Sequence, residues 1–217
     1  MQSVISYPSI MLPRRRTVIV SRLRLLKLFE SYLDHQLVLL VSPPGYGKTS
    51  LLVDFAHASS LPVCWYTIDP YDQEPGRFLA HFTAAIAQQF TGFCQATEAA
   101  LRNLTDQREC PDSLIHILVN DLRQHARQRF ILILDDFQHV DEQPFINAFL
   151  SHFLECTRET CCLVIASRRR PRLEALEKLP AYDQVASLTE RDLAFCSAEI
   201  QALARQNYQI EVSAKDA

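Results

Sequence analysis

The placement of glycine constrains the fold of this chain more than any other feature of its sequence. Only four glycines occur among the 217 residues, and two of them, Gly45 and Gly47, flank a single tyrosine. They belong to the segment SPPGYGKTS at residues 42–50, which fits the phosphate-binding pattern G-x-x-x-x-G-K-[ST] except that Ser42 replaces the first glycine. Because such a loop connects a buried strand to the start of a helix, the pattern predicts both elements around it.

Short apolar runs alternate with amphipathic segments along most of the chain. The runs are nearly unbroken, which is typical of strands buried on both faces of a parallel sheet. Strands are therefore predicted at residues 36–42, 63–69, 130–136, 162–167 and 185–188. Apolar residues recur with helical spacing at residues 21–34, 49–59, 75–90, 114–127 and 145–156. The alternation indicates an α/β fold in which helices pack on a parallel sheet.

The C-terminal part of the chain carries the signals of a further helix. Thr189 and Asp192 have the spacing of a helix-capping pair. The apolar residues that follow would share one face of a single helix: Leu193, Phe195, Ile200 and Leu203. Because this face needs a partner, we expect the helix to begin a lid that another domain covers.

The glycine-containing loop supplies the groups that hold a nucleoside triphosphate. Gly45 and Gly47 let backbone N–H groups wrap the β-phosphate, and the following helix directs its positive end there. Lys48 is expected to bridge the β- and γ-phosphates and Thr49 to place its hydroxyl on Mg²⁺. The predicted nucleotide-binding residues are Pro44, Gly45, Tyr46, Gly47, Lys48, Thr49 and Ser50. A chance match in a turn is the alternative, and the order of strand, loop and helix disfavours it.

Two acids end the apolar run ILILDD at residues 131–136, the form of a Walker B strand. Asp135 is expected to hold Mg²⁺ together with Thr49, through water. Asp136, one residue beyond, is the candidate to orient or deprotonate the attacking water. The alternative for Asp136 is a cap at the strand end.

Arg168 directly follows the run CLVIAS at residues 162–167, where a planar cation could read the γ-phosphate, so we predict a catalytic role for it. The cluster that it begins also fits a solvated loop or a nucleic-acid patch. The other members, Arg169, Arg170 and Arg172, are expected on the surface. No Asn-Lys-x-Asp motif follows a late strand, so ATP is favoured over GTP.

Composition excludes several other classes of protein. A net charge of −3 argues against a chain built mainly to coat nucleic acid or an acidic membrane. The chain has no signal-peptide pattern and no apolar run approaching about 18 residues, so a cytoplasmic location without membrane contact is expected. The seven cysteines form no C-x-x-C pair and are expected to be apolar fillers, with an exposed thiol as the alternative.

Four stretches together resemble one family: SPPGYGKTSLL, VCWYTIDPYDQEPGRFLAHF, FILILDDFQHVD and LVIASRRRP. They are similar to the nucleotide-binding domain of MalT-type regulators, the ATP-dependent transcriptional activators of the LuxR superfamily. That domain belongs to the STAND class of ATPases, which is related to AAA+ proteins. The resemblance covers roughly residues 14–205 and matches Lys48 and Thr49 to the P-loop, Asp135 and Asp136 to the Walker B acids, and Arg168 to the sensor arginine.

The resemblance implies a P-loop NTPase fold, a three-layer α/β/α sandwich with a five-stranded parallel sheet in the order 5-1-4-3-2. Residues 1–35 would then form an N-terminal arm and helix, residues 36–190 the P-loop ATPase core, and residues 191–217 the start of a truncated helical lid. The segment from Arg22 to Leu26 would pack near the adenine, with an ordinary helix surface as the alternative. Trp65, Asp69, Asp72 and Arg77 match a family stretch without an assigned role, and Trp65 is equally suited to the core.

The predicted function is that of a regulatory switch in a signal-responsive bacterial transcriptional activator. Such a domain binds ATP or ADP with Mg²⁺, hydrolyses ATP slowly as a weak Mg²⁺-dependent ATPase, and self-associates in the ATP state. DNA would be bound only through domains absent from this chain. One alternative is a turnover AAA+-type ATPase, a loader or remodeller that acts as an oligomer with Arg169 or Arg170 as its finger. Another is a non-enzymatic interaction module, which Ser42 in place of glycine suggests.

Overall fold

A five-stranded sheet forms the centre of the computed structural model, which describes residues 5–15, 20–93, 95–102, 112–179 and 183–211. The strands are β1 (Leu37–Val41), β2 (Val63–Thr67), β3 (Phe130–Asp135), β4 (Cys161–Ser167) and β5 (Val185–Thr189). All neighbours are parallel and the order is β2-β3-β4-β1-β5, which confirms the predicted order. The carboxyl ends of β1, β3 and β4 therefore meet at one edge of the sheet.

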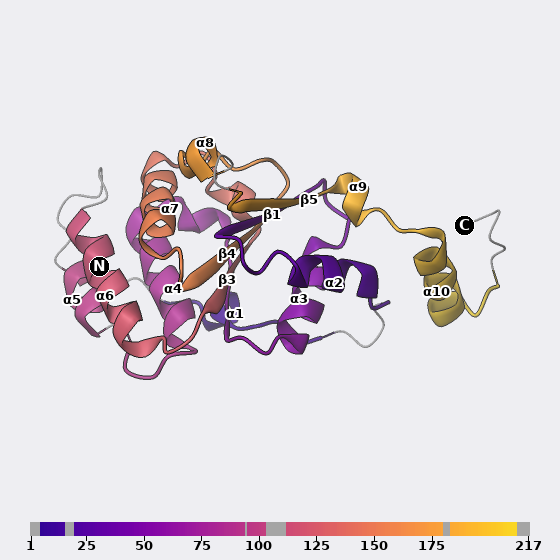
Figure 1. Ribbon diagram of the computed structural model, residues 1–217, viewed down its shortest axis with the longest axis horizontal. Coiled ribbons are helices and arrows are strands. Elements are labelled where there is room, and N and C mark those ends of the chain that lie inside the picture. The colour runs from indigo at the N-terminus through magenta and orange to yellow at the C-terminus, as the bar shows by residue number, and fades with distance from the viewer. Residues whose placement is uncertain (1–4, 16–19, 94, 103–111, 180–182, 212–217) are drawn as a thin grey trace.

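Helices cover both faces of this sheet (Figure 1). One face carries α2 (Leu23–Glu30) and α3 (Lys48–Ala58), and the other carries α4 (Pro75–Ala87), α6 (Asp112–His125) and α7 (Pro144–Cys156). The remaining helical elements are short or peripheral: α1 (Tyr7–Ile10), α5 (Gln95–Arg102), α8 (Ala175–Lys178), α9 (Glu190–Leu193), α10 (Ser197–Tyr208), and the 3-10 turns η1 (Pro70–Gln73) and η2 (Phe137–His139). The predicted three-layer α/β/α sandwich is confirmed.

Each layer is held by alternate side chains of the strands. Along β1, Leu37 and Leu39 pack with α4 and α7, whereas Val38 and Leu40 pack with α2 and α3. On the first face the ring of Phe82 from α4 meets that of Phe149 from α7 edge to face, with centroids 5.1 Å apart. Burying one such side chain stabilises the fold by about 1.5–3 kcal/mol, so these contacts fix the helices that flank the sheet.

The segment after β5 differs from the single helix that its pattern predicts. The helix α9 ends at Leu193, residues 194 and 196 are extended, and α10 begins at Ser197. Thr189 and Asp192 do form the predicted cap. A second cap, in which the Cys196 backbone N–H donates to Glu199 (3.1 Å), starts α10 anew. Because the chain restarts there, Leu193 is buried while Phe195 is 42% exposed.

Three cysteines, Cys64, Cys161 and Cys162, lie in the core, where burial raises the pKa of the Cys162 thiol to about 12. Cys196 is exposed, whereas Cys94 and Cys110 lie outside the described residues. Within the described ranges, none of the helices has the length and apolar character needed to cross a membrane.

Candidate functional site

The loop between β1 and α3 has the backbone that a phosphate cradle requires. Gly45 and Gly47 have φ angles of +91° and +79°, in the left-handed region that favours glycine. A Cβ atom placed on either glycine would meet nothing within 4 Å, so the space beside the loop is open. Gly47 caps α3, which directs its unpaired N–H groups and positive dipole end into this space.

Lys48 lies folded over the carbonyl groups of the same loop. Its ammonium donates to the backbone oxygens of Ser42 (2.6 Å) and Pro43 (3.1 Å) and to Ser42 Oγ (3.3 Å). Burial lowers the pKa of Lys48, and the nearby carboxylates of Asp135 and Asp136 oppose that effect. The serine that replaces the first glycine is thus compatible with the loop and supplies an additional acceptor for Lys48.

Asp135 and Thr49 place two oxygen atoms side by side that are suited to coordinate a metal ion. The Thr49 hydroxyl donates to Asp135 Oδ2 (2.8 Å), and the backbone N–H of Asp136 donates to Asp135 Oδ1 (3.1 Å). Hydroxyl and carboxylate oxygens are ligands that Mg²⁺ prefers. Among the described residues no group of three or more His, Cys, Asp or Glu is arranged to hold a metal. A cation beside this pair would therefore take its other ligands from phosphate and water.

The burial of Asp135 predicts pH-dependent stability. Burial raises the pKa of this carboxyl from 3.8 to about 6, against the hydrogen bond from Thr49, which lowers it. The folded state therefore binds more protons than the unfolded state between these pH values, and the free energy of unfolding falls as the pH rises through them. Without Mg²⁺ we expect a loss of about 2 kcal/mol from pH 4 to pH 6.5.

Denaturant titrations of the wild type and Asp135→Asn at pH 4, 5.5 and 6.5 measure this effect. The variant lacks the titrating group, so its free energy of unfolding should fall less over the same interval. Equal changes in the two proteins would contradict the assignment.

Asp136 and Arg168 are connected through Gln138, a residue that the sequence pattern did not predict as part of the site. Gln138 Nε2 donates to Asp136 Oδ1 (2.8 Å), and the backbone N–H of Arg168 donates to Gln138 Oε1 (3.2 Å). Asp135, Asp136 and Arg168 all lie close enough to Lys48 to influence its pKa. The structure therefore brings together the predicted residues from β1, β3 and β4. The only signal for Gln138 was its position shortly after the paired acids.

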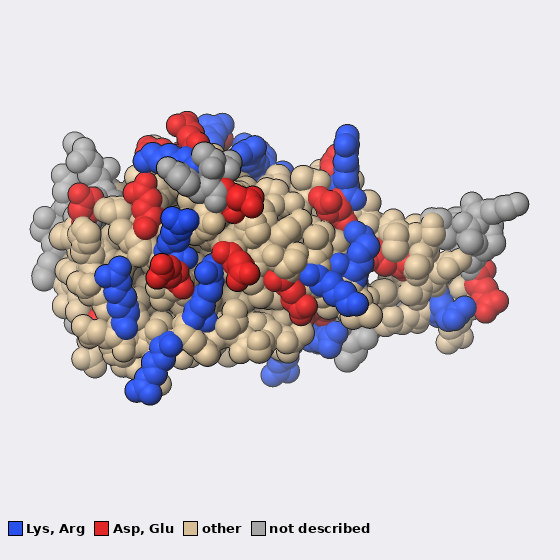
Figure 2. Space-filling view, viewed as in Figure 1, with Lys and Arg blue, Asp and Glu red and all other residues tan. Residues whose placement is uncertain are grey.

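Two of the other arginines after β4, Arg169 and Arg172, face acidic partners. Arg169 pairs with Asp141 (3.0 Å) and Glu142 (3.3 Å), and Arg172 approaches Glu142 (3.7 Å). On the face drawn in Figure 2, basic and acidic side chains are interspersed over the surface. The local compensation of charge agrees with the solvated-loop interpretation of Arg169 and Arg172 rather than with a nucleic-acid patch.

Residues 65–77 match the family stretch that has no assigned role. Within this stretch, ion pairs stabilise the turn that follows β2. Arg77 donates to the buried Asp72 (2.8 Å) and to Asp69 (3.0 Å). Gln73 Nε2 in the same turn donates to the carbonyl of His139 in η2 (3.0 Å). Trp65 is buried in the core, as one of its two interpretations proposed. These contacts support the segment of chain that carries Gln138.

Arg22 lies on the connection between α9 and α10. Its guanidinium donates to the carbonyls of Leu193 and Ala194 (2.8 Å each) and to Glu199 Oε2 (3.0 Å). It also stacks on the ring of Phe195, 4.4 Å from the centroid. Arg22 is therefore buried against the later part of the chain, whereas Leu23 is exposed, and the contact of this segment with an adenine stays a prediction.

Comparisons with known proteins agree with this arrangement. The chain is 32% identical over 201 residues to the HTH-type transcriptional regulator MalT of Cronobacter sakazakii, which covers 93% of this chain and 21% of that protein. This chain thus spans about a fifth of the length of the curated relatives that it matches. The resemblance of this chain to MalT-type regulators is therefore confirmed over most of the chain.

Two solved structures show the same fold. A Walker-type ATPase of Pyrococcus abyssi superposes with a TM-score of 0.54 at 14% identity, covering 94% of this chain and 63% of that one. The Orc1 protein of Aeropyrum pernix, solved in complex with DNA, gives a TM-score of 0.53 at 18% identity, covering 94% and 51%. Residues 18–165 match the family model of the AAA ATPase domain, and the chain belongs to that family.

Proposed function

We propose that this chain is the ATP-binding switch domain of a signal-responsive bacterial transcriptional activator and that it hydrolyses ATP slowly. The observation that carries the proposal is the contact of Thr49 Oγ1 with Asp135 Oδ2 (2.8 Å), within electrostatic range of Lys48. This contact joins the phosphate loop to the end of β3. The similarity to MalT proteins, whose name describes transcriptional regulators, supports the regulatory role.

Each residue of the site has a proposed part in binding or chemistry. The residues proposed to bind the nucleotide are Pro44, Gly45, Tyr46, Gly47, Lys48, Thr49 and Ser50. Thr49 and Asp135 would hold Mg²⁺, which neutralises phosphate charge when bound. Asp136 orients a water for attack on the γ-phosphorus, and Arg168 interacts with the γ-phosphate.

Hydrolysis at this site forms a bond between the water oxygen and the γ-phosphorus and breaks the bond to the β–γ bridging oxygen. ADP and inorganic phosphate are the products. The proton of the attacking water passes to Asp136 or to the phosphate. The slow conversion of ATP to ADP would end the active state.

The proposal extends to the organisation of the protein. Residues 1–35 are an arm and helix ahead of the first strand, residues 36–190 the ATPase core, and residues 191–217 the beginning of a lid. DNA binding is assigned to domains outside this chain, and self-association to the ATP state. The alternative of a turnover ATPase needs a free arginine finger. Arg169 is paired with Asp141 and Glu142, so Arg170, which is exposed, is the remaining candidate for that role.

Nucleotide retention distinguishes a switch from a turnover enzyme. The purified chain is loaded with Mg²⁺ and labelled ATP, free nucleotide is removed, and bound and released species are followed over time. A switch retains ATP or ADP for many minutes and releases little free ADP. Free ADP that accumulates over many turnovers would favour the loader or remodeller, and an absence of retained nucleotide would contradict the binding function in this chain.

The change Lys48→Ala should weaken ATP binding at least about tenfold, because a hydrogen bond to a charged partner contributes about 1.5–3 kcal/mol. Titration of each protein with a fluorescent ATP analogue measures the affinity. Lys178→Ala is the matched control, since Lys178 is exposed on α8 and pairs with Glu155 at the surface. Wild-type affinity in Lys48→Ala would contradict the phosphate-site assignment.

A further inference from the structure

Gln138 lies between the two groups to which the proposed function assigns the chemistry. It belongs to η2, directly after β3, and its side-chain amide contacts both sides at once. The amide nitrogen donates to Asp136 Oδ1 (2.8 Å), and the amide oxygen accepts from the backbone N–H of Arg168 (3.2 Å). Gln138 therefore connects the end of β3 to the end of β4.

The chemistry of the two contacts allows only one orientation of this amide. A carboxylate accepts hydrogen bonds and a backbone N–H donates one, so the amide nitrogen must face Asp136 and the amide oxygen must face Arg168. Only a side chain with a donor and an acceptor on one planar group satisfies both. Glutamate would offer two acceptors, and methionine would offer neither a donor nor a strong acceptor.

The backbone around Asp136 makes such a contact useful. Asp136 has a φ angle of +58°, in the left-handed region that non-glycine residues adopt at a cost of about 1 kcal/mol or more. This conformation begins the η2 turn and sets the direction of the carboxylate. The described hydrogen bond of that carboxylate uses Oδ1, which leaves Oδ2 for a water molecule. A fixed Oδ1 reduces the orientations that Oδ2 can take.

The turn that carries Gln138 is itself held in place. Gln73 in η1 donates to the His139 carbonyl (3.0 Å), and the backbone N–H of His139 donates to the Asp136 carbonyl (3.2 Å). The ring of Phe137 is fully buried in the core. Gln138 thus extends from a rigid segment, as a residue that orients another side chain must.

We propose that Gln138 is a positioning residue for ATP hydrolysis, because it fixes the orientation of the Asp136 carboxylate relative to Arg168 at the end of β4. The proposal rests on the proposed function and adds to it a residue that touches neither the nucleotide nor the metal. It predicts that changes at Gln138 slow the chemical step and leave ATP affinity intact.

The test uses Gln138→Met, Gln138→Glu and the acid variant Asp136→Asn, alone and combined with Gln138→Met. In single-turnover experiments the conversion of protein-bound ATP to ADP should slow about tenfold to a hundredfold in both Gln138 variants, since a small misplacement of a reacting group has effects of this size. ATP affinity should change less than about threefold, because Gln138 is not proposed to contact the bound ATP. In the Asp136→Asn background, Gln138→Met should change the residual rate less than about twofold.

A second measurement follows the Arg168 amide itself by hydrogen exchange in the nucleotide-free chain. Gln138→Glu keeps an acceptor for this N–H and should retain its protection, whereas Gln138→Met removes the acceptor and should accelerate its exchange. Faster exchange in both variants, or in neither, would overturn the proposed geometry.

The outcomes separate this proposal from the one on which it rests. A wild-type chain that binds ATP without converting it would refute the hydrolytic function, and the positioning role with it. A wild-type chain that converts ATP at the same rate as Gln138→Met would refute the positioning role alone. An equal loss of rate from Gln138→Met in the presence and absence of the Asp136 carboxylate would show a general structural effect instead.

Discussion

Asp136→Asn is expected to slow the conversion of bound ATP to ADP by about a hundredfold to ten-thousandfold, while ATP stays on the protein. The asparagine amide has nearly the shape of the carboxylate but cannot accept the proton of the attacking water, and general-base catalysis contributes rate factors of this size. Asparagine also tolerates the φ angle of +58° at this position. Its amide oxygen can still accept from Gln138, so the loop should remain in place.

The chain provides a matched control for this experiment. Asp183 is an exposed aspartate with a φ angle of +52°, and Asp183→Asn makes the same chemical change in the same backbone conformation away from the phosphate loop. It should convert bound ATP at the wild-type rate. Retention of wild-type hydrolysis in Asp136→Asn would contradict the role of this acid, and loss of ATP binding in that variant would show that Asp136 acts in binding.

The sheet and the phosphate loop could be predicted from the sequence because their signals are local. A strand buried on both faces must be apolar at nearly every position, and the predicted strand at residues 36–42 differs from the observed Leu37–Val41 by one residue at each end. The loop was marked by glycines at the two positions that need a positive φ angle. The strand order came from the family resemblance, since a local pattern does not state which strands are neighbours.

The features that were missed depend on contacts between distant segments. Gln138 acquires its role only because the ends of β3 and β4 lie side by side, which its neighbours in sequence do not indicate. The helix α5 (Gln95–Arg102) was not predicted, since its eight residues are mostly polar or alanine. The break between α9 and α10 was hidden because its second cap uses Cys196, a residue type outside the usual capping set.

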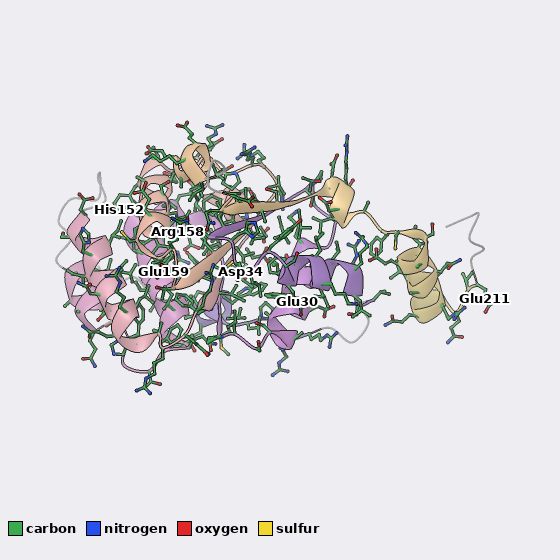
Figure 3. The ribbon with its side chains drawn as sticks, in the orientation of Figure 1. Glu30, Asp34, His152, Arg158, Glu159 and Glu211 are labelled. Carbon is green, nitrogen blue, oxygen red and sulfur yellow. The ribbon has the colours of Figure 1, made fainter. Side chains whose placement is uncertain are left out.

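Arg22 is the clearest example of such a contact, since it joins the start of α2 to residues more than 170 positions later. Figure 1 shows α10 standing apart from the sheet and its covering helices, and Figure 3 places Glu211 at the far end of that segment. The side chain of Arg22 is only 7% exposed, and that of its partner Glu199 is 10% exposed. Removal of Arg22 takes from Glu199 its nearest cationic partner and from the carbonyls of Leu193 and Ala194 a charged donor, while Arg24 stays 3.4 Å from Glu199.

Arg22→Ala should therefore release the connection and α10 from the core. The change removes three hydrogen bonds made by a charged group, each of which contributes about 1.5–3 kcal/mol, so we expect a hundredfold or larger increase in local opening. Limited proteolysis and hydrogen exchange at residues 194–208 measure this opening. Because the sheet and its helices do not depend on Arg22 for their packing, the thermal midpoint of the core should change much less than the local protection.

Arg24 provides the control because it contacts the same connection from the solvent side. Its side chain is 44% exposed, and its guanidinium donates to the Ala194 carbonyl at 3.2 Å and to Glu199 at 3.4 Å. Exposed pairs of this kind contribute up to about 1 kcal/mol, so Arg24→Ala should increase opening by less than about tenfold. Equal effects of the two changes would mean that burial does not determine how strongly each arginine holds the connection between α9 and α10. A large effect confined to Arg22→Ala would identify one buried guanidinium as the group that fixes α10 relative to the ATPase core.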